Sequence, residues 1–189
     1  MAVQDSSADP GAVVTVRPAV PADAPALSEV AAATFALACP PSTTQEAIDD
    51  FIAASLSEAA FARYLADPER TVLVAEHAPG APLDGYTMLV AGDPVDPDVA
   101  AVVRVRPTAE LSKIYVREGS HGRGTASELM TRTLDAARDR GAVGIWLGTN
   151  QENVRAQRFY GKHGFARVGT KRFKLGDEYE HDFVYERAL

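Results

Sequence analysis

Two polar side chains that could take part in chemistry, Asn153 and Tyr160, lie in the segment Asn153 to Phe165. Its pattern predicts a helix over residues 151–163. Positions 153, 156 and 160 are spaced i, i+3 and i+7, so they share one helical face. Because Ala156 is small, this face would carry a groove with an amide at one end and a phenol at the other. A neighbouring basic stripe of Arg155, Arg158 and Lys162 could contact phosphate groups.

Each of these features also has a plain structural explanation. Tyr160 could be a core tyrosine with a satisfied hydroxyl, and Asn153 could simply cap the helix. The basic stripe could be a solvated helix face. Phe159, in contrast, is predicted to pack in the core. The helix alone therefore suggests a site without assigning one.

A second segment, Ile114 to Ala126, joins a predicted strand to a predicted helix through a loop rich in small residues. Residues 122, 124 and 126 are Gly, Gly and Ala, which let the backbone approach a ligand closely. The start of the helix adds unpaired N–H groups and the positive end of the helix dipole. Together these features predict a cradle for a pyrophosphate. Neither common nucleotide fingerprint is present, however, and a purely structural turn remains the alternative.

The rest of the chain supplies the strands and helices that would position these two segments. Residues 92–106 are expected to form a loop with a short extended piece at 100–105. Residues 1–12 are expected to be a mobile tail and 13–189 one domain, of the α/β class with a mixed sheet. The patterns predict strands at residues 12–17, 71–76, 85–91, 109–116, 143–147, 165–174 and 180–187, and helices at 21–37, 43–66 with a break near Ser57, 123–140 and 151–163.

Composition narrows the classes of function. The chain has 189 residues, of which 46% are hydrophobic and 24% charged, as in an ordinary globular domain. No apolar stretch is long enough to span a membrane and no secretory signal is present, so the cytoplasm is the expected compartment. The net charge of −7 lies entirely in residues 1–60, with eight acids and one base, which leaves no basic surface for nucleic acid. The single Cys39 cannot form an internal disulfide, and the four histidines lack metal-ligand spacing, so no metal is expected.

Taken in chain order, with the glycine loop before the helix, the two motifs resemble those of the GNAT superfamily of N-acetyltransferases, and the predicted strand order resembles that of this family over residues 13–187. The family's Gln/Arg-x-x-Gly-x-Gly/Ala loop corresponds to His121-Gly-Arg-Gly-Thr-Ala126. Its Asn-x-x-Ala-x-x-Phe-Tyr-x-x-x-Gly-Phe helix corresponds to Asn153–Phe165 without a mismatch. His121 departs from the usual Gln or Arg, but backbone N–H groups are expected to supply most phosphate contacts. Other details resemble the PaiA-like branch, which is associated with polyamine acetylation: Ala33-Thr-Phe35, Lys113-Ile-Tyr-Val116, Trp146-Leu-Gly148, Phe173-x-Leu-Gly-Asp177 and Asp182-Phe-Val-Tyr185.

The resemblance implies a GNAT fold, a single domain with a central mixed, mostly antiparallel sheet flanked by helices. It also implies acetyl-CoA as co-substrate and direct transfer of its acetyl group to a primary amine, without an acyl-enzyme. Tyr160 matches the family's general acid, and Val116 matches the position whose backbone N–H stabilises the oxyanion. The residues expected to bind acetyl-CoA are Ile114, Tyr115, Val116, His121, Gly122, Arg123, Gly124, Thr125, Ala126, Asn153, Tyr160 and Lys162.

Glu110 is the candidate general base, because some family members carry a catalytic glutamate six residues before the position of Val116. Strand alternation would place residues 110, 112, 114 and 116 on one face of the sheet, where Glu110 could act directly or through water. An ordinary strand-end glutamate is the alternative. Cys39 has no histidine or acid at motif spacing and is not expected to be a nucleophile.

The sequence leaves the acceptor open. The PaiA-like details and the acidic first 60 residues favour a small polycationic amine such as spermidine or spermine. Its ammonium groups could be held by acids of the first helices, namely Glu46, Asp49, Asp50 and Glu58. The alternatives are a protein N-acetyltransferase and a catalytically silent, regulatory module that binds acetyl-CoA. No nucleic-acid or membrane partner is expected, and the sequence does not decide between a monomer and a homodimer.

Overall fold

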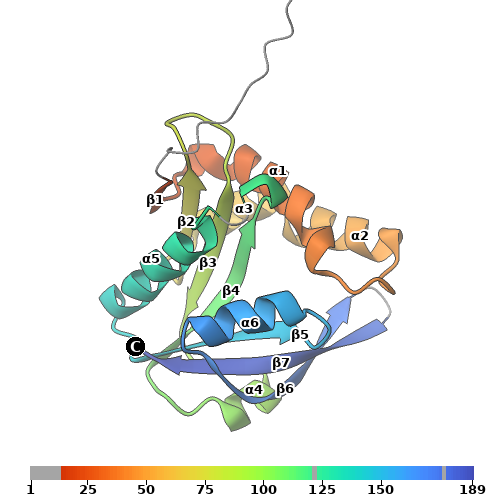
Figure 1. Ribbon diagram of the computed structural model, residues 1–189, viewed down its shortest axis with the longest axis vertical. Coiled ribbons are helices and arrows are strands. Elements are labelled where there is room, and N and C mark those ends of the chain that lie inside the picture. Colours follow the sequence, from red (N-terminus) through yellow and green to blue (C-terminus); the bar gives the residue numbers. More distant parts are fainter. Residues whose placement is uncertain (1–13, 121–122, 176–177) are drawn as a thin grey trace, which may run out of the picture.

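The central feature of the fold is one mixed β-sheet (Figure 1). The computed structural model describes residues 14–120, 123–175 and 178–189. Within them, seven strands lie in the order β1 (Thr15–Pro18), β2 (Arg70–Glu76), β3 (Gly85–Ala91), β4 (Thr108–Val116), β5 (Gly144–Asn150), β7 (Glu178–Ala188) and β6 (Ala166–Leu175). Neighbouring strands are antiparallel except β4 and β5, which run parallel. The expected mixed, mostly antiparallel sheet is therefore confirmed, whereas the expected tail at residues 1–12 lies outside the described residues.

Helices cover both faces of this sheet. Their bounds are α1 (Ala24–Phe35), α2 (Gln45–Ser55), α3 (Glu58–Ala66), α4 (Pro97–Val102), α5 (Thr125–Asp139) and α6 (Val154–Lys162), with single turns at η1 (Pro21–Asp23), η2 (Ala36–Ala38) and η3 (Glu118–Ser120). On one face, residues of α1, α2 and α3 form a buried cluster with β2 and β3 around Leu27 and Tyr86. On the other, α5 and α6 bury Leu134 and Tyr160 against β4, β5 and β7. No helix in the described part of the chain is long and apolar enough to cross a membrane.

Most predicted boundaries agree with the structure where the chain carries an explicit start or stop signal. The region predicted to be helical at 43–66 is divided at Ser57, whose Oγ accepts a hydrogen bond from the Ala60 N–H at 3.4 Å. At the other end of a helix, α5 stops just before Gly141, which has a φ of +82°. Such caps satisfy backbone groups that the helix itself leaves unpaired, so they fix its ends locally.

One predicted region was wrong, because residues 97–102 form α4 instead of a loop leading to an extended piece at 100–105. Asp96 caps this helix: its Oδ1 accepts from the N–H of Asp98 at 2.9 Å, and Pro97 occupies the first helical position. Val99 is fully buried and packs in a cluster with Trp146. The cap and this burial outweigh the β propensity of the valines that suggested an extended segment.

The parallel strands β4 and β5 pair over only three residues each, Thr108–Glu110 with Gly144–Trp146. Beyond this point β4 continues to Val116 beside β3, and β5 continues to Asn150 beside β7. The two strands therefore separate, and Figure 1 shows β4 turning away from β5. We call this opening in the middle of the sheet the fork.

A β-bulge at Ser112 decides which residues of β4 face which side of the fork. Leu89 pairs with Leu111 and Met88 with Lys113, so Ser112 is the extra residue on β4. The prediction that residues 110, 112, 114 and 116 share one face was therefore wrong. Glu110 shares its face with Lys113 and Tyr115 on the side of α1, whereas Ile114 and Val116 face α5.

Candidate active site

Two hollows meet at the fork, and the first is a groove of about 170 Å³. It brings together the two motifs of the sequence, because its walls come from the end of β4, the start of α5 and the exposed face of α6. The end of α1 closes one side. The residues that line it are Thr34, Leu37, Ala38, Ile114, Tyr115, Val116, Ala126, Asn153, Arg155, Ala156, Phe159 and Tyr160.

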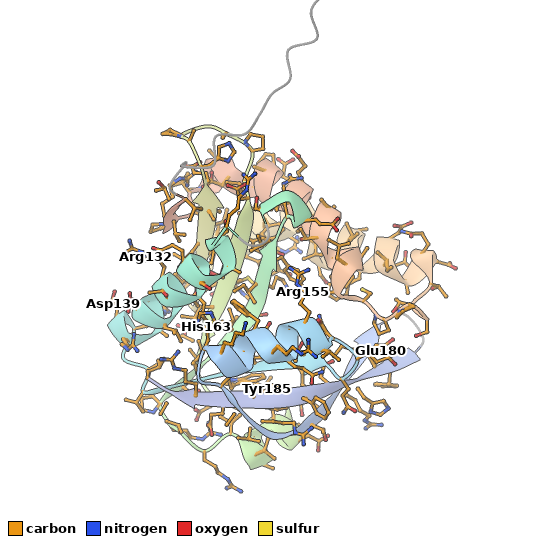
Figure 2. All side chains as sticks on the ribbon, in the orientation of Figure 1. Arg132, Asp139, Arg155, His163, Glu180 and Tyr185 are labelled. Carbon is orange, nitrogen blue, oxygen red and sulfur yellow. The ribbon has the colours of Figure 1, made fainter. Side chains whose placement is uncertain are left out.

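The α6 wall of the groove begins at Asn153. This residue is the N-cap of α6, and its Oδ1 accepts a hydrogen bond from the Ala156 N–H at 3.0 Å. The cap explanation and the site explanation of Asn153 are thus compatible, because the same residue lines the groove. Of the basic stripe, Arg155 also lines the groove, and Figure 2 shows it on the side of α6 that faces α1. Arg158 and Lys162 are exposed and are not among the described residues that form the groove.

The glycine loop borders the groove at the start of α5. It is described from Arg123 onward, so the predictions for His121 and Gly122 lie outside the described residues. Gly124 is the N-cap of α5 and has a φ of +84°, a left-handed conformation that favours glycine. A Cβ built at Gly124 would meet nothing within 4 Å, so the space over it is open. The N-terminal N–H groups of α5 therefore border open space beside the groove.

Tyr160 stands where the groove meets the second hollow. The residue is only 8% exposed, and its ring packs against Phe165 and Tyr185 with centroid distances of 6.0 and 6.2 Å. Its hydroxyl has no hydrogen-bond partner among the residues that the structure describes. Burial raises the pKa of this hydroxyl above its ordinary value, and the neighbouring Tyr115 and Asp182 raise it further. Tyr160 therefore keeps its proton at neutral pH.

The second hollow is a cavity of about 250 Å³ that lies on the α1 face of the sheet and reaches α6 through the fork. Its walls come from the α1–α2 segment, from β4, β5, β6 and β7, and from α6. They comprise Phe35, Ala38, Cys39, Pro40, Phe51, Glu110, Leu111, Ser112, Lys113, Ile114, Tyr115, Gly148, Thr149, Asn150, Asn153, Ala156, Tyr160, Lys171, Glu180 and Asp182. Six residues line both hollows, namely Ala38, Ile114, Tyr115, Asn153, Ala156 and Tyr160. We call these six the shared wall.

Three carboxyl groups face the cavity. Burial raises the pKa of Asp182 to about 6, and the nearby Lys171 opposes this effect. Burial also raises the pKa of Glu110, again opposed by Lys171 and by Lys113. Glu180 accepts a hydrogen bond from Asn150 Nδ2 at 3.2 Å, and Figure 2 places it near the end of β7 closest to α2. The cavity thus contains two carboxyl groups with raised pKa values, of which Asp182 exchanges its proton near pH 6.

Two lysines line the same cavity. Burial lowers the pKa of Lys113 to about 8. Lys171 extends from β6 across Gly148 and holds its Nζ 5.6 Å from the centroid of the Trp146 ring. Cys39, also in the lining, has a thiol whose pKa burial raises to about 11, so it is protonated and a poor nucleophile at neutral pH.

Sequence reasoning singled out five of the six residues of the shared wall, all except Ala38, but missed most of the charged residues of the cavity. Glu110 lies in the cavity as expected, whereas Lys171 and Glu180 were not singled out, and Lys113 and Asp182 were given no role. The available signal was a charged residue within a strand whose neighbours are apolar, as for Asp182 before Phe183 and Val184. The acids expected to hold an ammonium group, Glu46, Asp49, Asp50 and Glu58, are exposed and are not among the described residues of the cavity lining.

Comparisons with known proteins agree with this geometry. A family model described as the acetyltransferase (GNAT) family matches residues 37–165. A Mycobacterium tuberculosis (strain H37Rv) protein named as an uncharacterized N-acetyltransferase is 48% identical over 167 residues, which cover 88% of this chain and 98% of that protein. The PaiA N-acetyltransferase of Thermoplasma acidophilum, solved with coenzyme A, has a TM-score of 0.73 at 18% identity, covering 94% of this chain and 99% of that one. A structure from Salmonella typhimurium, solved with its cofactor acetyl-CoA, has a TM-score of 0.63 at 22% identity and covers 94% of both chains.

Proposed function

This chain belongs to the acetyltransferase (GNAT) family and is an N-acetyltransferase, and we propose that it transfers the acetyl group of acetyl-CoA directly to a primary amine bound in the cavity. The observation that supports this most strongly is the shared wall, because its six residues line the groove and the cavity together. A donor in the groove and an acceptor in the cavity would meet beside Tyr160. Holding two reactants in contact replaces a bimolecular encounter, which removes a large part of the entropic barrier to reaction.

The groove and the start of α5 fit acetyl-CoA. The open space over Gly124 leaves room for a phosphate close to the backbone, and the first N–H groups of α5 would donate hydrogen bonds to it. The residues that would hold the co-substrate are Arg123, Gly124, Thr125 and Ala126 at its phosphates, with Ile114, Tyr115, Val116, Asn153, Arg155 and Ala156 along the groove. When bound, acetyl-CoA supplies an acetyl group activated as a thioester. Solved structures of the same fold that contain coenzyme A or acetyl-CoA support this assignment.

Tyr160 is the proposed general acid, because it holds a proton at the shared wall where the departing thiolate needs one. In water a thiol has a pKa of ~8.5 and a tyrosine one of ~10, so this proton transfer is mildly uphill. Burial raises the pKa of the Cys39 thiol in the neighbouring cavity to about 11, and it also raises the pKa of the Tyr160 hydroxyl. The acid and the thiolate therefore shift in the same direction, and the transfer stays uphill. Tyr160 fits the role because it keeps its proton at neutral pH and lies where the thiolate would form.

The proposed general base is a carboxylate of the cavity. A protonated primary amine has a pKa of ~10.4, so the acceptor is mostly an ammonium ion at neutral pH. It must lose a proton before its nitrogen can attack the thioester. Asp182 and Glu110 both line the cavity, and burial raises the pKa of each. Only Asp182 also acts electrostatically on Tyr160 and Tyr115, at the shared wall. We therefore assign the role of general base, which accepts the proton of the amine, to Asp182. Glu110, the base expected from the family resemblance, is the second candidate.

The acceptor is an amine that the cavity can hold beside this base. Its three carboxyl groups, Glu110, Glu180 and Asp182, could pair with an ammonium group of the acceptor. A polycation such as spermidine carries several such groups. The exposed acids Glu46, Asp49, Asp50 and Glu58 would add only long-range attraction, since exposed ion pairs are each worth ~0.2–1 kcal/mol and are screened by salt.

A thiol-release assay with acetyl-CoA and a panel of amines tests the proposed function. The panel contains spermidine, small diamines, free amino acids, an aminoglycoside and an N-terminal peptide, and mass spectrometry confirms the acetylated product. Release with small amines supports the proposal. Turnover of the peptide alone would identify a protein N-acetyltransferase instead. Tight acetyl-CoA binding by calorimetry without release to any amine would identify a silent, regulatory binding module.

A further inference from the structure

Two lysines of the cavity have no role in the proposed mechanism. We propose that Lys113 and Lys171 form an anion subsite, and that the acceptor is a small amine that also carries a carboxylate. This inference rests on the proposed function, because it concerns the acceptor of the same reaction. The acceptor would then be an amino acid or a similar zwitterion instead of a polycation.

The first observation is that neither ammonium group is paired with any residue that the structure describes. In the described part of the chain, no carboxylate oxygen lies within 4 Å of either Nζ and neither lysine makes a side-chain hydrogen bond, although Arg17, Arg70 and Arg117 each have an ion pair. Lys113 is half-buried, and Nζ of Lys171 lies 5.6 Å from the centroid of the Trp146 ring. A charge that is partly buried without a partner is costly, so a cavity lined by two unpaired ammonium groups suits a ligand that pairs with them.

The second observation is the arrangement of the opposite charges around the cavity. Glu110 interacts electrostatically with both lysines, and Asp182 interacts with Lys171, yet none of these groups approaches within ion-pair distance. Positive and negative side chains therefore line the same cavity without forming ion pairs with each other. A zwitterion can pair its ammonium with Asp182 and its carboxylate with the lysines. A polycation would leave both lysines uncompensated and add like-charge repulsion, which disfavours it.

The third observation is the size of the cavity. Its volume of about 250 Å³ is at the small end for ligand sites, since typical pockets have ~300–1,000 Å³. Aromatic rings of Phe35 and Phe51, stacked with centroids 4.4 Å apart, limit it on the side of α1 and α2. This small volume favours a compact acceptor of amino-acid size over a large one such as an aminoglycoside.

Matched acceptors that differ only in a carboxylate test the subsite. We would measure kcat/KM by thiol release for L-lysine against cadaverine and for L-ornithine against putrescine. The wild-type protein should prefer each amino acid by about tenfold or more, as expected for charge-assisted hydrogen bonds. Lys113→Met and Lys171→Met should each reduce kcat/KM for the amino acids and leave or increase that for the diamines. Lys174→Met is the matched control, because Lys174 is exposed on the same strand as Lys171 and lies outside the described cavity lining.

The outcomes distinguish a failure of the anion subsite from a failure of the proposed acetyltransferase function. Preference for the diamines, equal use of both members of a pair, or a preference that survives both lysine substitutions would overturn the subsite while the acetyltransferase assignment stands. Calorimetric titration of the protein with L-lysine and cadaverine gives a readout that needs no turnover. If no amine is acetylated, the proposed function fails, and the subsite fails with it unless L-lysine binds and Lys171→Met removes that binding.

The pH dependence of the preference is an independent check. Lys113 has a pKa lowered to about 8, and the charged groups that face it are Glu110, Arg70 and Lys171. Raising the pH through this value removes the positive charge of Lys113. The ratio of kcat/KM for L-lysine over cadaverine should therefore fall above pH 8 in the wild type, and Lys113→Met should abolish that fall. A ratio that does not change across this range in the wild type would contradict a role for Lys113.

Discussion

A Cβ built at Gly148 would lie 2.5 Å from Cε of Lys171 and 3.2 Å from Oδ2 of Asp182. The missing side chain on β5 thus lets Lys171 cross from β6 over the strand surface into the cavity. Because Cε belongs to a flexible side chain, Gly148→Ala should leave the fold intact but displace Lys171. We expect kcat/KM for an amino-acid acceptor such as L-lysine to fall by about tenfold or more, with little change in acetyl-CoA affinity or melting temperature.

Gly144, on the same face of the same strand, is the control for this substitution. Its added Cβ would meet the carbonyl oxygen of Val105 at 2.6 Å, which cannot move without the backbone. Gly144→Ala should therefore lower the stability of the protein by ~1–3 kcal/mol and leave the acceptor KM of the folded enzyme unchanged. Normal acceptor kinetics in Gly148→Ala would show that the position of Lys171 does not matter for the reaction.

Tyr160→Phe keeps the ring and its packing but removes the proton of the proposed acid. We expect kcat to fall by ~10²–10⁴-fold while acetyl-CoA binding, measured by calorimetry, changes little. Tyr185→Phe is the matched control, because Tyr185 packs against Tyr160 in the same core but is outside the described lining of both hollows. A Tyr160→Phe enzyme with normal kcat, under conditions where chemistry limits the rate, would remove Tyr160 from the mechanism.

The phosphate cradle can be tested with two glycines at opposite ends of α5. Gly124 and Gly141 have φ values of +84° and +82°, and an added Cβ would meet nothing within 4 Å at either. Leucine at either position should therefore cause similar backbone strain. Only Gly124→Leu should weaken acetyl-CoA binding in calorimetry, because its side chain occupies the space over the N-terminus of α5. Equal affinities in the two variants would place the phosphates elsewhere.

The proton acceptor can be identified from pH profiles. Asp182 has a pKa raised to about 6, and a base acts only when deprotonated, so kcat/KM should fall as the pH drops through 6. Asp182→Asn should reduce kcat by ~10²-fold or more and remove this acidic limb. Glu110→Gln, by contrast, should keep the limb and change mainly KM, because Glu110 interacts with Lys113 and Lys171. The reverse pattern would make Glu110 the base.

Local signals in the sequence predicted most of the scaffold and five of the six residues of the shared wall. Asn153, Ala156 and Tyr160 share a helical face whatever surrounds them, and Ser57 caps a helix through its own backbone neighbours. The separation of β4 from β5 depends on pairing between distant segments, so no single segment predicts it. The bulge at Ser112 likewise depends on how β4 pairs with a distant segment, β3. One extra residue changes the face of Glu110, and only the register against β3 reveals it.

The charged lining of the cavity could not be predicted for a related reason. Lys113, Lys171 and Asp182 lie on three different strands, and they face one space because of the sheet order β4-β5-β7-β6. Asp182 lies opposite Lys171 in the register of β6 and β7, and Gly148 leaves the space above them. In the sequence, each is simply a charged residue in a strand. Their common location follows from pairing that joins residues far apart in the chain.

The shared wall divides the molecule into parts that can change at different rates during evolution. The groove is lined mainly by apolar and aromatic side chains and by the small residues Ala126 and Ala156, and Arg155 is the one charged residue among its described lining. The cavity is bounded by charged side chains of separate strands, and none of Lys113, Lys171 or Glu180 belongs to the groove. Single substitutions there can exchange one amine for another while the donor side stays intact. Variation in substrate among descendants of this fold should therefore concentrate at the cavity, whereas Asn153, Ala156 and Tyr160 serve both sides and have little freedom to vary.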